Sequence, residues 1–151
     1  GLFNNTTPTS SVFSVGTNSR VNTSGDTYVA YVFADVPGYS KFNTWVGNAD
    51  SSDGPFVYLG FKPAFIMYKS RAQEDWELLD NKRVGYNFDN NPLKAHSSDA
   101  EATTDRGDLL SNGFKIRTGG AQINGNGTTY IYMAFAESPF VSSSGVPNNA
   151  R

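Results

Sequence analysis

The sequence predicts an all-β protein, a single antiparallel β-sandwich of jelly-roll type with an extended N-terminal arm. Aromatic residues make up 14% of the 151 residues, charged residues make up 17%, and there are 15 glycines, a composition typical of turn-rich β proteins. About ten short apolar runs alternate with turn-forming residues, which is the pattern of sandwiches and barrels. No long amphipathic run with a helical period interrupts them.

A partial internal repeat is the most informative feature of the chain. Residues 27–35 read TYVAYVFAD and residues 129–137 read TYIYMAFAE, with an offset of 130 − 28 = 102 between the tyrosines. The match extends upstream, so that residues 13–35 correspond to residues 114–137. A period of this length is longer than that of solenoid repeats and predicts a domain-sized unit repeated in tandem.

The chain begins with a predicted arm, residues 1–15, which is polar apart from a Leu2-Phe3 tip and a short strand at residues 11–16. Two interpretations of the first residues stay open: a frayed terminus, or an arm whose tip inserts into another molecule. We expect the sandwich domain to span residues 16–140 and a polar tail to span residues 141–151.

Residues 27–35 are predicted to form a central strand. Alternate side chains point to opposite faces of a strand, and here both sets are apolar, as in a strand that is covered on both sides. We therefore expect this segment to join the chain's own sheet.

Further strands are predicted where β-branched and aromatic residues cluster between turn formers: residues 41–48, 55–61, 63–70, 75–80, 113–118 and 129–137. Pro63 lacks a ladder donor, so the chain should break or change sheets there. Residues 81–107 are polar and are predicted to be surface loops or short strands, with one helical turn at residues 99–103.

Charge and cysteine content exclude several classes of function. The formal net charge is −2 and there is no basic run, so nucleic acid is not an expected partner. There is no cysteine, which excludes disulfides, thiolate metal sites and cysteine nucleophiles. No apolar run approaches the roughly 20 residues that cross a bilayer. No signal peptide stands at Gly1, so we expect a mature or excised chain, or one exported without such a signal.

The candidate catalytic groups point away from an enzyme. His96 is the only histidine and lies in a polar stretch, so we predict a solvated loop histidine rather than a zinc ligand or a triad member. An acidic cluster surrounds Trp76, and a glycosidase would need two such carboxylates on opposite sides of a sugar. We predict instead a solvated strand face for the cluster, which consists of Glu74, Asp75, Glu77 and Asp80.

Three further site hypotheses arise from residue types. Asn48, Asp50 and Asp53 could offer oxygens to Ca²⁺, but they lack the EF-hand order and its closing Glu, so we predict a plain hairpin loop and no cofactor.

Aromatic side chains could form a sugar-stacking platform, although core or interface packing is the favoured interpretation. These are Trp45, Trp76, Tyr39, Tyr58, Tyr68 and Tyr86. Glycosylation sequons stand at Asn4, Asn5, Asn22 and Asn126.

Four phrases in order carry a resemblance to a known family: PGYSKFNTWVGN, DGPFVYLGFKPAFIMYKS, LLSNGFKIRT and TYIYMAFAESPF. They resemble a module of unassigned function in marine bacteriophage tail-fibre-like and other virion-associated proteins. The resemblance implies that residues 11–35 are the end of a preceding module and residues 39–140 a complete one. It implies a location outside the cell or on a virion surface, and it brings no catalytic residues.

From the repeat and the resemblance we predict a non-enzymatic structural subunit of an extracellular fibre or phage tail appendage. It would assemble head-to-tail with further copies as the arm adds a strand to a sheet edge near residues 113–118 or 129–137. The predicted assembly residues are Leu2, Phe3, Val12, Phe13, Val15, Phe114, Ile116, Ile131, Met133 and Phe135. The alternative is a carbohydrate-binding module that recognises a cell-surface glycan at a tail-fibre tip through exposed aromatics and residues 48–53.

Overall fold

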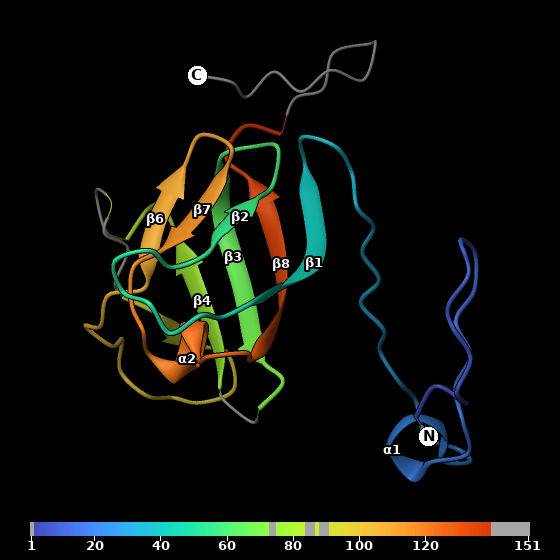
Figure 1. Cartoon of the computed structure of the whole chain (residues 1–151). Coiled ribbons are helices and arrows are strands. Elements are labelled where there is room, and N and C mark those ends of the chain that lie inside the picture. Colours follow the sequence, from blue (N-terminus) through green and yellow to red (C-terminus); the bar gives the residue numbers. More distant parts are fainter. Residues whose placement is uncertain (1, 73–74, 84–86, 88–90, 140–151) are drawn as a thin grey trace. The chain divides into compact units, whose positions relative to one another are not determined.

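The computed structural model describes residues 2–72, 75–83, 87 and 91–139, and the predicted tail at residues 141–151 lies outside these ranges. The chain divides into two compact units, Gly1–Phe33 and Ala34–Arg151 (Figure 1). We call them the N-terminal unit and the β unit. The division follows Phe33, whereas the sequence suggested a domain that begins at residue 16.

The N-terminal unit is organised around a single helical turn, α1 (Ser19–Asn22). The Asn18 side chain accepts a hydrogen bond from the second residue of the helix and so caps its start. The Tyr28 hydroxyl donates to the carbonyl oxygen of Ser19 at 2.9 Å and accepts from the backbone N–H of Thr23 at 2.8 Å. These two hydrogen bonds hold Tyr28, and with it the start of the repeated segment, against α1.

Residues 11–16 and 27–35 lie in no strand, contrary to prediction. The residue pattern supplied β propensity, but a strand also needs a neighbour that pairs with its backbone groups. The helical turn predicted at residues 99–103 is also absent, and short helices lie instead at α1 and α2 (Ala121–Asn124).

The β unit confirms the prediction of an all-β antiparallel sandwich. Its larger sheet has five strands in the order β1 (Ser40–Val46), β8 (Thr129–Ala136), β3 (Pro63–Ser70), β4 (Trp76–Asp80) and β5 (Leu93–Lys94). Its smaller sheet has three, in the order β2 (Phe56–Tyr58), β7 (Gly113–Ile116) and β6 (Gly107–Leu110). All described strand pairs are antiparallel, and the two sheets face each other as two layers (Figure 1).

The predicted break at Pro63 is confirmed as a change of sheet. β2 belongs to the smaller sheet and β3, which begins at Pro63, belongs to the larger one. Gly60 lies between them with φ of 81°, a backbone conformation that favours glycine. The register of β3 against β8 also shifts between Pro63 and Phe65, so the pairing is irregular at the start of the strand.

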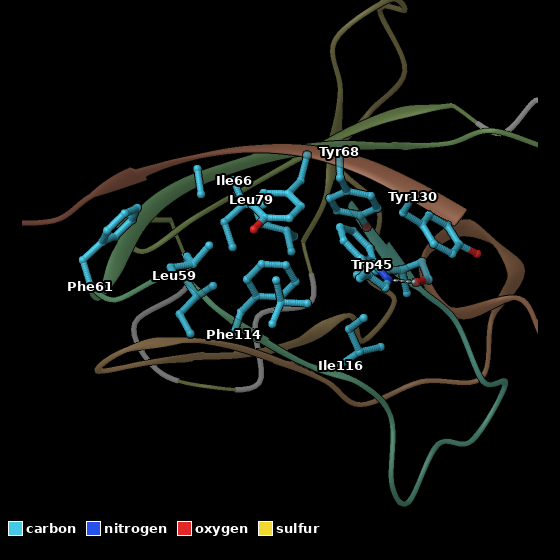
Figure 2. Packing of buried hydrophobic residues seen from close by; sticks show 14 of the residues in the cluster. Trp45, Leu59, Phe61, Ile66, Tyr68, Leu79, Phe114, Ile116 and Tyr130 are labelled. Atoms are coloured by element: carbon cyan, nitrogen blue, oxygen red, sulfur yellow. Dashed lines mark hydrogen bonds between the residues drawn. The ribbon is translucent and has the colours of Figure 1, made fainter. Parts of the chain in front are cut away.

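Aromatic rings from both sheets meet at the centre of the core (Figure 2). The Trp45 ring stacks on Tyr130 with centroids 4.9 Å apart and packs edge-on against Tyr68 and Phe114 at 5.6 and 5.5 Å. Its Nε1–H donates to the carbonyl oxygen of Ile123 at 3.1 Å. Because Phe114 lies on the smaller sheet, Trp45 holds the two layers together.

Candidate functional site

Most exposed large apolar side chains of the described residues belong to the N-terminal unit. They are Leu2, Phe3, Val12, Phe13, Val15, Tyr28, Val29, Tyr31, Val32 and Phe33. The extremes are Tyr31 at 83%, Val29 at 80% and Val32 at 74% exposure. In the other copy of the repeat, the counterpart of Val32 is Ala134, which is fully buried in β8. This position of the repeat is therefore buried in one copy and exposed in the other.

The predicted acceptor edges are wrong, because neither of them is an edge. β8 pairs with β1 on one side and β3 on the other, and β7 pairs with β2 and β6. Phe114 and Ile116 on β7 are 3% and 0% exposed and belong to the core. The apolar character of both faces of residues 129–136 was the signal in the sequence for an internal strand.

The outer edge of β1 is closed by the chain itself. The backbone N–H of Phe42 donates to Asp35 Oδ1 at 2.7 Å, and the backbone N–H of Thr44 donates to Asn43 Oδ1 at 2.8 Å. Val36 forms an isolated bridge with the start of the strand. Two of the backbone N–H groups that an added strand would need are thus already bonded to side chains, and blocking of this kind is a common protection for edge strands.

The outer face of the five-stranded sheet carries a continuous apolar row. Directly paired positions run from Phe42 on β1 through Met133 on β8, Met67 on β3 and Leu78 on β4 to Leu93 on β5. These side chains are half-buried. They point away from the core, because their neighbours along the strands fill it.

A cluster of aromatic rings widens this row. Phe135 lies 5.9 Å from Phe42, 6.1 Å from Phe65 and 6.2 Å from Tyr39, measured between ring centroids. We call the seven residues Phe42, Phe65, Met67, Leu78, Leu93, Met133 and Phe135 the outer apolar face. Antiparallel sheets with one face on a core usually have a polar outer face, so this surface is a candidate interaction site. The predicted assembly residues Ile131, Met133 and Phe135 all lie on this side of β8.

A buried ion pair joins the two sheets and corrects the prediction of a solvated face for Glu77. Arg106, just before β6, donates from Nε and Nη2 to the Glu77 carboxylate at 2.7 and 2.8 Å, and the Tyr68 hydroxyl donates to the same carboxylate. Glu77 and Arg106 are 3% and 7% exposed. Burial raises the pKa of Tyr68 well above its usual value. Glu77 and Arg106 are thus paired with each other, as expected of an ion pair that stabilises the contact between the two sheets.

His96 lies in a charged surface cluster. Its Nε2 is 3.0 Å from Asp75 Oδ1, while Lys94 Nζ is 3.0 Å from Asp75 Oδ2 and 3.0 Å from Asp99 Oδ2. The hydrogen bond from Lys94 lowers the pKa of Asp75. Glu74, also predicted for the acidic cluster, lies outside the described residues.

In the loop at residues 48–53, which the sequence suggested as a calcium site, the side chains of Asn48, Asp50 and Asp53 form hydrogen bonds or an ion pair within the protein. Asp50 Oδ1 accepts from the backbone N–H groups of Asp53 and Ser52 at 2.9 and 2.7 Å, and these bonds lower the pKa of Asp50. The Asp53 carboxylate pairs with Lys115 Nζ at 2.8 Å, and the Asn48 amide donates to the backbone of Asp53 at 2.7 Å. Across the described ranges, no group of three or more His, Cys, Asp or Glu side chains is placed to hold a metal ion.

The aromatic residues proposed as a sugar platform are dispersed. Trp45 and Tyr68 belong to the core, Trp76 is half-buried, and Tyr86 lies outside the described residues. Tyr58 is 60% exposed and lines a cleft of about 300 Å³.

Two charged side chains, Asp35 and Lys41, also line this cleft, and Lys41 Nζ lies 5.9 Å from the centroid of the Tyr58 ring. Burial, and then the nearby carboxylate of Asp35, raise the pKa of Tyr132 to about 12. The cleft therefore combines one exposed ring with groups of both charges, which the sequence did not bring together.

The four sequons, at Asn4, Asn5, Asn22 and Asn126, are all exposed. Asn22 also uses its side-chain amide to donate to the carbonyl oxygen of Gly16 at 3.1 Å. Among the described residues, no helix is long and apolar enough to span a membrane.

Comparison with protein families gives a match that covers residues 1–139 and thus extends over parts of both compact units. The family is described as "Domain of unknown function (DUF7483)". No curated protein and no solved structure matches the chain. Since the match extends over far more than half of the sequence, the chain belongs to the DUF7483 family.

Proposed function

We propose that this protein is a non-enzymatic structural subunit that associates with further copies of itself through its N-terminal unit. In line with the resemblance of its phrases to phage modules, the assembly is an extracellular fibre or a phage tail appendage. One observation carries the proposal. Residues 27–33 repeat the sequence of a central strand, yet they lie in neither sheet and expose their apolar side chains.

β8 illustrates what this type of sequence requires. There, neighbouring strands pair with both edges, and the core covers the face that carries Tyr130, Tyr132 and Ala134. Burial of a large apolar side chain stabilises by about 1.5–3 kcal/mol, so Val29, Tyr31 and Val32 together offer roughly 5–9 kcal/mol. Association itself costs an estimated 4–15 kcal/mol. The three side chains thus offset much of this cost, and the other exposed residues of the N-terminal unit supply the remainder.

The proposed contact is heterologous, because the donor is the N-terminal unit and the acceptor is a surface of the β unit. Contacts of this kind continue from copy to copy, and they form a ring if the rotation closes or a filament if it does not. The use of two different surfaces on each copy is therefore compatible with a fibre.

Removal of the exposed apolar side chains is expected to abolish assembly. The full-length double variant Val29→Ser/Tyr31→Ser should sediment as a 16.4-kDa monomer, whereas the unmodified protein should form larger species that grow with concentration. Sedimentation velocity and negative-stain microscopy measure the difference.

The matched control is Tyr58→Ser, which removes another exposed tyrosine outside the N-terminal unit and should leave assembly intact. A protein that stays monomeric up to millimolar concentration would contradict the proposal. So would a double variant that assembles like the unmodified chain.

Carbohydrate recognition is a second candidate, favoured by the cleft that Tyr58 lines. An exposed ring next to Asp35 and Lys41 offers a stacking surface and polar groups for hydroxyls. If this function holds, the protein should bind specific glycans on an array, and Tyr58→Ser should weaken that binding at least tenfold. The double variant Val29→Ser/Tyr31→Ser should bind them normally, and an array without specific signal would exclude the candidate.

A further inference from the structure

We infer that the N-terminal unit of one copy docks on the outer apolar face of a second copy, and not on a sheet edge. The inference rests on the proposed function and names its acceptor. The partner is a second copy of this chain, and each copy supplies one donor unit and one acceptor face.

Sheet edges are poor acceptors for the exposed segment. Residues 27–33 form a stretch of 33 − 27 + 1 = 7 residues. The edge strands β2, β5 and β6 contain 3, 2 and 4 residues, so they are too short to pair with it. β1 has 7 residues, but Asp35, Asn43 and Val36 close its outer edge.

The dimensions of the outer apolar face match the segment. Five strands spaced about 4.8 Å apart make a sheet roughly 19 Å wide between the axes of its outer strands. An extended stretch of seven residues reaches at most about 23 Å. The segment can therefore cross the sheet along the row from Phe42 to Leu93 and contact all five strands.

The two surfaces also match in charge. Residues 27–33 contain no charged side chain, and neither do the seven residues of the outer apolar face. Contact between these two sets of side chains therefore buries no charge that they carry, which avoids one large cost of burial.

The area of such a contact fits a repeated assembly better than a tight isolated dimer. Aromatic side chains bury about 150–250 Å² each, so Tyr31 and Phe33 with one valine cover on the order of 500 Å². A standard interface buries about 800 Å² per partner. The remaining exposed residues of the N-terminal unit would supply the difference.

Cysteine cross-linking tests the acceptor directly, because the chain contains no cysteine of its own. A full-length Tyr31→Cys protein is mixed with an equal amount of a size-tagged Ile131→Cys protein and treated with a short bismaleimide. Ile131 lies beside the outer apolar face and is 38% exposed, so its replacement is expected to leave the packing of the core unchanged. A cross-linked heterodimer is expected in at least fivefold higher yield than with size-tagged Tyr58→Cys, whose side chain marks the edge strand β2.

The possible outcomes separate the acceptor from the proposed function. If the protein assembles but Tyr58→Cys gives a cross-link yield equal to or higher than that of Ile131→Cys, the outer apolar face is not the acceptor. The proposed function is unaffected by that result. The same holds if the double variant Tyr31→Cys/Ile131→Cys links only within one chain and the mixed proteins do not link. If the unmodified protein does not assemble at all, the proposed function fails and the acceptor fails with it.

A charge at the centre of the face gives an independent measurement. Met67 lies in the middle of the row, between Met133 and Leu78. Met67→Lys is expected to abolish assembly while far-UV circular dichroism stays that of the folded β unit, and Met67→Leu should assemble normally. Normal assembly of a folded Met67→Lys variant would overturn the inference.

Discussion

Replacing Glu77 with glutamine is expected to lower the free energy of unfolding of the β unit by about 3–5 kcal/mol. The substitution leaves the Arg106 guanidinium buried without its counter-charge, since its Nε and Nη2 bonds at 2.7 and 2.8 Å both end on the Glu77 carboxylate. Urea unfolding followed by far-UV circular dichroism measures the change. Glu101→Gln is the matched control, because its carboxylate is more exposed and its loss should cost less than about 1 kcal/mol.

Removal of the whole buried polar group should restore most of this stability. In the triple variant Glu77→Leu/Arg106→Met/Tyr68→Phe no charge or hydroxyl is left without a partner, and apolar replacements of similar volume are often neutral. A Glu77→Gln variant within 1 kcal/mol of the unmodified protein would show that the pair does not hold the sheets together.

Trp45→Ala is expected to destabilise the β unit by about 3–5 kcal/mol, because it leaves a cavity among rings of both sheets. Trp45→Phe should cost less, about 1–3 kcal/mol, since most of the packing stays while the carbonyl oxygen of Ile123 loses its donor. Circular dichroism during urea unfolding is the suitable measurement, because fluorescence would lose one of its two tryptophans.

Trp76→Phe serves as the control for the loss of an indole ring. Trp76 is half-buried on the outer side of β4, so its replacement should cost under about 1.5 kcal/mol. A Trp45→Ala variant as stable as Trp76→Phe would mean that Trp45 does not organise the core.

Local pattern was sufficient to predict most strands of the β unit. Apolar and β-branched runs predicted β1, β2, β3, β4, β7 and β8, and the missing donor of Pro63 predicted the change of sheet. β6 was not predicted, because its sequence GDLL contains a buried charged residue. Asp108 is 8% exposed and is paired with Arg117 Nε at 2.6 Å. An alternation of apolar and polar residues does not reveal a polar residue that is buried with a partner.

The candidate site depended on information that local sequence does not contain. The burial of Glu77 requires Arg106, which lies 29 residues further along the chain. The outer apolar face arises only from the register of five strands, which places one apolar residue of each in a single row. Residues 27–33 show the converse, because their pattern predicts a strand that the structure does not contain.

The occupied outer edge of β1 has a consequence for how the protein behaves at high concentration. Amyloid-like stacking needs a long strand with exposed backbone groups that can template the next chain. Among the described edge strands, the one with 7 residues has its Phe42 and Thr44 amides engaged by side chains of Asp35 and Asn43. Templated cross-β growth from this strand is thereby disfavoured, although the molecule exposes many large apolar side chains.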